Sequence, residues 1–273
     1  MRWVIGDIHG MLRPLDAILR AVRARDAAAR FIFVGDYVNR GPESPGVIDR
    51  LLGLSHATFL RGNHDDIFDL ILNGRCYISH EESPDAMSAF RWFMNHGLAD
   101  TLMAYGADWA ELEFLVRHPD AARLKRVLDA VPQKHRDFIR SLRAVAEYDD
   151  FFVAHAYWDV DEPDNSPDLA GRLLADPSLR QQLLWGRYTD EQIRRKKRWK
   201  RTGYFGHTPV NNYRREGEPL PMKGPQIVLL DTGVALGAHG RLSAVCAESG
   251  EVIQSDRAGA VLRPTGTGPG LKP

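Results

Sequence analysis

The sequence has few cysteines and no long apolar run, and each of these absences excludes a class of protein. Only two cysteines, Cys76 and Cys246, occur among 273 residues. They form neither the disulfide framework of a small secreted domain nor a pair spaced for a zinc finger. No apolar segment reaches the ~18 residues that a membrane-spanning helix needs, and no secretory signal is visible. We therefore expect a cytoplasmic protein that makes no membrane contact.

The chain also lacks a net charge. Lysine plus arginine and aspartate plus glutamate both number 36. Because there is no overall field, affinity for phosphate must come from a local patch. The run 194–201 packs seven basic residues around Trp199. This run is either a solvated helix end or loop, or a basic rim that attracts a polyanionic substrate. It is a weak signal for nucleic acid, which is not an expected partner.

The first part of the chain alternates between short apolar runs and helical periodicity. Three apolar runs end in the motifs GDIHG, GDYVNRG and RGNHD, and two segments with helical spacing separate them. This alternation predicts a parallel sheet with crossover helices. The carboxyl ends of parallel strands lie along one edge of a sheet, where ligands bind. The three motifs are therefore expected in one crevice.

The rest of the chain predicts one α/β domain with an insertion. Residues of about 66–148 have helical patterns, and two later strands end in histidines. Closing strands follow, which we expect to be antiparallel. We predict a catalytic domain over residues 1–255, with this helical insertion inside it. The Gly- and Pro-rich residues 256–273 are predicted to form a flexible tail.

Polar side chains follow five of the predicted strands. They are Asp7, His9, Asp36, Asn63, His64, His155 and His207. Taken singly, each is most simply a turn or core residue. Taken together, they are the ligands expected of two divalent cations. Carboxylate, amide and imidazole ligands without thiolate suit Mn, Fe or Zn and argue against a structural zinc. Asp36, on the middle strand, is the natural bridging ligand.

Three arginines stand near these motifs. Arg40 follows Asp36 in the same loop, Arg61 precedes Asn63, and Arg187 ends the segment LLWGR. A guanidinium group binds a tetrahedral oxyanion through two parallel hydrogen bonds. We expect Arg40 and Arg187, and less strongly Arg61, to contact a phosphate. The alternative is a surface arginine or one paired with a carboxylate.

The motifs GDIHG, GDYVNRG and GNHD, in this order and about 25 residues apart, resemble the calcineurin-like metallophosphoesterases. Within that superfamily the chain is similar to the phosphoprotein phosphatases. It is most similar to the bacterial and phage lambda-type serine/threonine phosphatases and the symmetrical diadenosine tetraphosphatases. The resemblance runs from Arg2 to about Ser255. It implies a four-layer α/β/β/α sandwich with a helical insertion after the third strand.

The resemblance also implies a set of roles. Asp7, His9 and Asp36 would hold one metal ion, and Asp36, Asn63, His155 and His207 a second. The ions would be Mn²⁺, with Fe or Zn possible. His64 would be the general acid, and Arg40 and Arg187 would hold the phosphate. The implied mechanism is direct attack by a hydroxide that bridges the two ions, without a phosphoenzyme.

The chain departs from the family pattern at several positions. The usual GDYVDRG is GDYVNRG here, so Asn39 replaces an aspartate that partners the acid histidine. Neutral Asn39 can orient His64 but cannot stabilise its imidazolium by charge. Asp65 stands where phosphatases of this branch often carry glutamate. Tyr157 and Trp158 follow His155 and could offer an aromatic face to the substrate.

Three functions remain open. The first, which we favour, is a metal-dependent serine/threonine protein phosphatase. The alternative is a dinucleoside polyphosphate hydrolase, whose leaving group needs less help from an acid. The third is a metal-bound phosphate reader without catalysis, which the intact ligand set disfavours.

Overall fold

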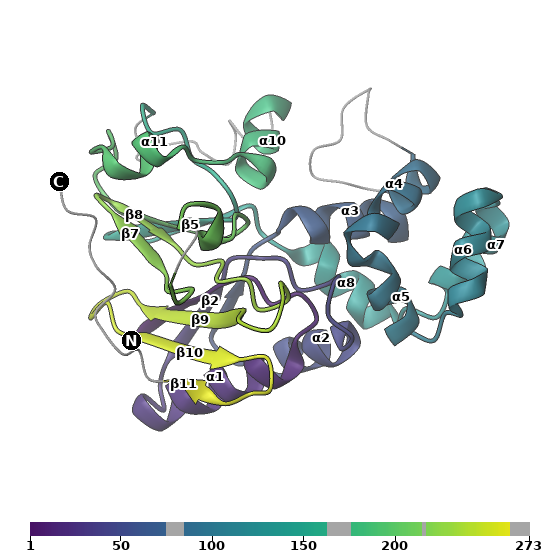
Figure 1. Ribbon diagram of the computed structural model, residues 1–273, viewed down its shortest axis with the longest axis horizontal. Coiled ribbons are helices and arrows are strands. Elements are labelled where there is room, and N and C mark those ends of the chain that lie inside the picture. Colours follow the sequence, from purple (N-terminus) through teal and green to yellow (C-terminus); the bar gives the residue numbers. More distant parts are fainter. Residues whose placement is uncertain (75–84, 163–175, 215–216, 263–273) are drawn as a thin grey trace.

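Two mixed sheets with helices on their outer faces make up the protein (Figure 1). The structure is a computed structural model that describes residues 1–74, 85–162, 176–214 and 217–262. Within these ranges no helix combines the length and the apolar character needed to cross a membrane.

The first sheet has six strands in the order β11-β10-β9-β1-β2-β3. Its parallel strands are β1 (Arg2–Ile5), β2 (Arg30–Phe33) and β3 (Ala57–Phe59). Its antiparallel strands are β9 (Arg241–Cys246), β10 (Val252–Asp256) and β11 (Val261–Leu262). Helices α1 (Leu12–Arg25) and α2 (Ser44–Leu52) are the crossovers between the parallel strands. The predicted parallel sheet is confirmed.

The second sheet has five strands in the order β4-β5-β6-β8-β7. The inner strands β5 (Phe151–Ala154), β6 (Thr202–Phe205) and β8 (Ile227–Leu229) run parallel. The edge strands β4 (Val145–Glu147) and β7 (Met222–Gly224) are antiparallel to their neighbours. The carboxyl ends of β5 and β6 deliver His155 and His207.

The two sheets pack face to face, which explains the alternation of side chains along each strand. Val4 belongs to the core between the sheets, together with Val153 and Val228 of the second sheet. Its neighbours Trp3 and Ile5 point to the other face and pack in the core under the helices. A third core on the outer face of the second sheet includes residues near α10 (Pro177–Trp185) and α11 (Asp190–Arg194). The predicted α/β/β/α order is confirmed.

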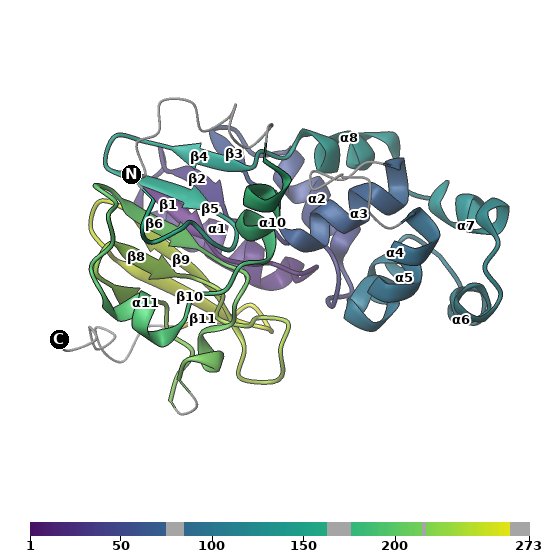
Figure 2. The same ribbon diagram turned by 90° about the horizontal axis from the view of Figure 1, so that it is seen from above.

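The helical insertion projects from the sandwich on the side of β3 (Figure 2). It contains α3 (Asn63–Asn73), α4 (Ala86–Phe93), the kinked turn η1 (Met94–Leu98), α5 (Ala99–Ala104), α6 (Trp109–Arg117), α7 (Ala121–Leu128) and α8 (Gln133–Ser141). The insertion expected over about 66–148 is therefore helical to Ser141. Its last residues already belong to the second sheet as β4.

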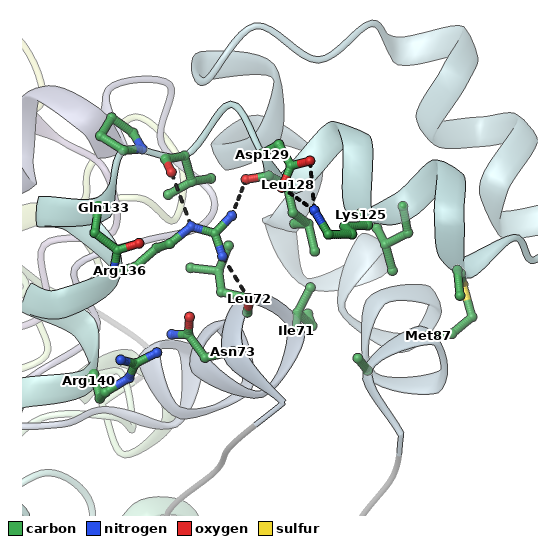
Figure 3. Close-up of a pocket in the computed structure, with 15 residues that line it drawn as sticks. Ile71, Leu72, Asn73, Met87, Lys125, Leu128, Asp129, Gln133, Arg136 and Arg140 are labelled. Carbon is green, nitrogen blue, oxygen red and sulfur yellow. Dashed lines mark hydrogen bonds and ion pairs between the residues drawn. The ribbon is translucent and has the colours of Figure 1, made fainter.

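A half-buried arginine ties three parts of this insertion together beside a cavity of about 640 Å³ (Figure 3). Arg136 donates to the carbonyl oxygens of Leu72, Leu128 and Val131. Leu72 and Leu128 lie in the last turns of α3 and α7, where carbonyls have no partner within the helix. One guanidinium group therefore satisfies the ends of two helices.

The flexible tail predicted for residues 256–273 begins too early, because the first sheet continues beyond residue 256. β10 continues to Asp256, and a turn with Gly259 at φ 91° returns the chain to pair as β11. Ser255 pairs with Val261 and Gln254 with Leu262. The sheet therefore extends to Leu262, and only 263–273 of the expected tail lie outside the described residues.

Candidate active site

The polar strand ends converge at one edge of the sandwich. Asp7, His9 and Asp36 follow β1 and β2, and Asn63 and His64 begin α3 directly after β3. His155 and His207 follow β5 and β6 of the second sheet, which packs against the first. All seven side chains are buried: Asp7 is 3% exposed and His155 is fully enclosed. The structure thus brings together every metal-ligand residue predicted from sequence.

The backbone around the site is strained. His9, Asp36, Asn39, Arg40 and His207 have φ values of 48°, 56°, 71°, 70° and 66°. A residue with a Cβ held in this left-handed region costs on the order of 1–3 kcal/mol. Only two other non-glycine residues of the described chain, His56 and Gln226, share it. Strain of this kind gathers where a function fixes the directions of side chains.

Asp65 holds the loop that carries Asp36. Its carboxylate accepts hydrogen bonds from the backbone N–H groups of Asp36, Tyr37 and Gly62, at 2.7, 3.0 and 3.0 Å. Position 62 must be glycine, because a Cβ there would lie 2.0 Å from Asp36 Oδ1. Asp36 Oδ1 in turn accepts from the His64 N–H at 3.0 Å. Asp65 therefore positions the site without facing it.

Two groups of ligand atoms lie close enough for a metal ion. One group is His9, Asp36 and His64, and the other is Asp7, Asp36 and His155, with ligand atoms within 4.8 Å of one another. Asp36 belongs to both, which is the geometry expected of a bridging carboxylate. The predicted general acid His64 falls within reach of the first group.

The hydrogen bonds of the histidines test whether a cation fits. His155 Nδ1 donates to the Val34 carbonyl at 2.9 Å, so Nε2 of the neutral ring carries a lone pair. That lone pair faces the amide oxygen of Asn63 at 3.0 Å and Asp36 Oδ1 at 3.6 Å. Such atoms repel one another unless a cation lies between them. The donor set therefore fits a divalent ion.

Further buried atoms of the site have no partner in the described protein. Among the predicted ligands these atoms are Asp7 Oδ1 and His207 Nε2. A buried polar atom without a hydrogen bond costs roughly 1–3 kcal/mol, so native proteins rarely keep one without a purpose. Both atoms belong to predicted ligands. Their lack of a partner supports the same conclusion as the facing lone pairs.

Burial sets the protonation of the site. It raises the pKa of Asp7 well above the usual carboxyl value, and the charges of Asp231 and Asp36 raise it further. Burial also lowers the pKa of His9 and His207 well below the usual imidazole value. Neutral imidazole is the form that binds metal ions. A bound cation would offset the repulsion among the carboxylates of Asp7, Asp36 and Asp231.

His64 is held between an amide and a guanidinium group. Arg40 Nη2 donates to His64 Nε2 at 3.1 Å, and Arg40 Nη1 donates to His9 Nε2 at 2.8 Å. The Asn39 amide lies 2.9 Å from His64 Nδ1. A neutral imidazole cannot accept at both nitrogens. Because Nε2 accepts from Arg40, we assign the proton to Nδ1 and exchange Oδ1 and Nδ2 of Asn39, so that the amide oxygen, otherwise without a partner, accepts from it. Asn39 therefore orients the ring without adding charge.

The three predicted phosphate-binding arginines differ in their surroundings. Arg40 lies against the two histidines, and exposed Arg187 donates to Thr208, next to His207, at 3.2 Å. Arg61 is 5% exposed and pairs with Asp66 and Asp69, both at 3.0 Å. It also donates to the carbonyls of Ile139 and Arg140. The expectation that Arg61 contacts phosphate finds no support, because its guanidinium group is paired with two carboxylates within the insertion.

Two aromatic or basic features expected beside the site lie elsewhere. Trp158 is buried in the outer core, and Tyr157 packs on Tyr188 with ring centroids 4.6 Å apart. The basic run 194–201 lies before the amino end of β6, at the edge opposite the site. Within it, Trp199 is in the core and Lys197 donates to backbone carbonyls. This run cannot form a rim around the site.

Sequence reasoning missed one acidic residue of the site. Asp231 follows β8 and is buried, and one of its oxygens, Oδ2, has no partner among the described residues. Its charge raises the pKa of Asp7. The signal was present in LLDTG, an apolar run that ends in a carboxylate like those of the other strands.

Comparison with known proteins agrees with this geometry. The family model described as "Calcineurin-like phosphoesterase" matches residues 2–210. The chain therefore belongs to the calcineurin-like phosphoesterases and is a hydrolase of that family. A divalent metal requirement is a property of this family, and the candidate ligand groups are present here.

Several relatives have a more specific name. A symmetrical bis(5'-nucleosyl)-tetraphosphatase of Bordetella pertussis is 43% identical over 65 residues, 23% of this chain and 24% of the relative. This match spans about a quarter of that relative's length. A protein of the same name from Pseudomonas putida is 25% identical over 93% of this chain and 92% of its own length. Both names describe those proteins.

A solved phosphatase structure shows the same fold. A protein serine/threonine phosphatase from Saccharomyces cerevisiae with similarity to human phosphatase PP5 superposes with a TM-score of 0.50 and 13% identity. The match covers 97% of this chain and 81% of that one. A putative diadenosine tetraphosphatase gives 0.49 and 21%, over 93% of this chain and 91% of that one.

Proposed function

We propose that this phosphoesterase hydrolyses dinucleoside polyphosphates with two divalent ions, Mn²⁺ being the first to test. One observation carries the reaction class: lone pairs of Asp36, Asn63 and His155 converge in a buried site, where His155 Nε2 lies 3.0 Å from the Asn63 oxygen and 3.6 Å from Asp36 Oδ1. The same edge presents Arg40 to an incoming anion. Convergent lone pairs next to a guanidinium group suit phosphoryl transfer.

Asp7, His9 and Asp36 would hold one ion, and Asp36, Asn63, His155 and His207 the other. Bound divalent ions supply Lewis-acid charge for a phosphoryl oxygen and lower the pKa of attacking water. Asp36 serves both positions, and the Asp65 carboxylate keeps its loop in place. We propose no further ligand, although Asp231 adds negative charge nearby.

The remaining residues bind the phosphate and handle the proton. Arg40, within 2.8 Å of His9 Nε2, and exposed Arg187 would hold phosphoryl oxygens on two sides. His64 would donate a proton to the leaving oxygen through Nε2. In the resting arrangement this nitrogen accepts from Arg40, so His64 must first gain a proton.

The partner of His64 favours an acidic leaving group. An aspartate at position 39 would stabilise the imidazolium, whereas neutral Asn39 only orients the ring. A nucleoside polyphosphate leaves as a stable anion and needs little protonation, in contrast to the alkoxide of serine. The name shared by the long Pseudomonas putida match supports the same substrate class.

A serine/threonine protein phosphatase is the second candidate, because GDYVNRG and the motifs around it resemble the lambda-type phosphatases. Its alkoxide leaving group would need the acid that Asn39 weakens. We therefore rank it below the dinucleotide substrate and reverse the order that the sequence alone suggested.

Hydrolysis of three substrates tests the proposal. Metal-stripped protein is assayed with and without added Mn²⁺ on diadenosine tetraphosphate, a phosphothreonine peptide and p-nitrophenyl phosphate. We expect metal-dependent turnover, with the dinucleotide preferred over the peptide by at least ten-fold in kcat/KM, about 1.4 kcal/mol. A peptide preferred by that factor would establish the second candidate. Absence of turnover with Mn, Fe and Zn would leave a phosphate reader.

A further inference from the structure

An aromatic cluster lies beside the candidate site and has no part in the proposed chemistry. Trp92 of α4 stacks on Trp185 at the end of α10, with centroids 5.6 Å apart and planes at 22°. His96 lies edge-on to Trp92, with centroids 5.4 Å apart. One indole ring comes from α4 of the insertion and the other from α10 on the outer side of the second sheet, the two helices labelled in Figure 1.

Rings of the cluster contact two histidines of the site, His64 and His207. Trp185 lies 6.2 Å from His207 between ring centroids. Phe93 lies 4.9 Å from Trp92 and 5.2 Å from His64. Trp185 is therefore a direct ring neighbour of His207, and Trp92 is linked to His64 through the ring of Phe93.

The same segment is fixed to the phosphate-binding loop. The Gly97 carbonyl accepts from the Arg40 N–H at 3.0 Å. Gly97 has φ 86°, and a Cβ there would lie 2.4 Å from the Arg40 nitrogen. Trp92 is thus held near Arg40 by a short stretch of chain, in which the kink at Gly97 supplies the close approach.

Trp92 keeps much of its surface open. It is 46% exposed, although it stacks on one indole and meets two other rings. An exposed tryptophan beside a buried polar site is typical of a ligand surface, since indole faces bind planar rings well. A phosphoserine side chain has no aromatic ring to place there.

We propose that Trp92 and Trp185 form a stacking platform for the nucleobase of the substrate, next to the phosphate held by Arg40 and Arg187. This inference rests on the proposed function and assigns its specificity to named residues. In a nucleotide one ribose separates the base from the phosphate, which matches a platform that adjoins the site without entering it.

Competition and fluorescence test the platform. ADP and inorganic pyrophosphate, which share a diphosphate, are compared as inhibitors of p-nitrophenyl phosphate hydrolysis and by quenching of tryptophan fluorescence in the metal-free protein. Trp92→Leu should weaken ADP about ten-fold, the order expected for base stacking, and leave pyrophosphate within about two-fold. Trp92→Phe should restore most of the loss. Trp109→Leu is the matched control, because Trp109 is 52% exposed on α6.

The outcomes separate the two proposals. Equal weakening of ADP and pyrophosphate by Trp92→Leu, or no weakening, would overturn the platform while metal-dependent turnover stands. A phosphotyrosine peptide weakened as much as ADP would assign the platform to a phenyl ring and overturn the nucleobase. If no ester is hydrolysed, the fluorescence titration still decides whether ADP is preferred through Trp92.

Discussion

Both ends of the sandwich carry carboxylate groups, but the two ends differ in how deeply these groups are buried and whether they are paired. At the carboxyl ends of the strands, Asp7 and Asp36 are buried, and Asp7 Oδ1 has no partner among the described residues. At the amino ends, Arg2 is paired with Asp150 and Glu248 at 2.8 and 2.7 Å in partly exposed ion pairs. The number of charges does not distinguish a site from a surface. Burial without compensation does.

The largest effect should come from removing one buried carboxylate. Asp7→Asn keeps the shape of the side chain and removes its charge. We expect kcat to fall by about 1,000-fold, because metal-ion catalysis supplies several kcal/mol. The metal-free variant should also be more stable than the parent by roughly 1 kcal/mol, since Asp36 and Asp231 no longer repel a third charge. Steady-state kinetics and urea unfolding measure the two effects.

The control for this substitution lies at the opposite end. Asp150→Asn makes the same change in an exposed pair, and should leave kcat within about two-fold and lower stability by less than ~1 kcal/mol. Equal behaviour of the two variants would mean that the ends of the sandwich do not differ in function.

The next effect concerns a charge that is buried but fully paired. Arg61→Met leaves the carboxylates of Asp66 and Asp69 without this partner. Breaking a buried ion pair on one side typically costs about 3–5 kcal/mol, which urea unfolding would measure. The exposed Arg140→Met on α8 is the matched control. If Arg61→Met instead raised KM at unchanged stability, its predicted contact with phosphate would be reinstated.

A smaller effect should come from restoring a carboxylate beside His64. Asn39→Asp should raise kcat/KM on a phosphoserine peptide about ten-fold, because the charged pair keeps His64 protonated. The aryl ester p-nitrophenyl phosphate needs no such proton and should change by less than two-fold. Kinetics on both substrates give the ratio. An unchanged ratio would mean that His64 is not the acid.

The residues of the site could be predicted from the sequence better than its surroundings could. Strand ends are set by short-range apolar patterns, so the motifs alone place Asp7, Asp36 and Asn63 on one edge. Arg61 could not be assigned in this way, because its partners in α3 and its carbonyls in α8 become neighbours only when the insertion folds. Trp92 and Trp185 meet across distant segments for the same reason.

The smallest effect is a pH dependence at the amino-terminal end. Although partial burial opposes it, hydrogen bonds from Arg2 lower the pKa of Glu248 to about 2, from an ordinary value of 4.5. A depressed carboxyl pKa stabilises the fold above pH 4.5, and this contribution is lost as the pH falls toward 2. Arg2→Gln should therefore lose less stability than the parent between pH 5 and 2, by under ~1 kcal/mol because the pair is partly exposed. Urea unfolding across this range, with kcat unchanged at pH 7, would show that this end contributes stability alone, whereas parallel pH curves would mean that the pair contributes nothing.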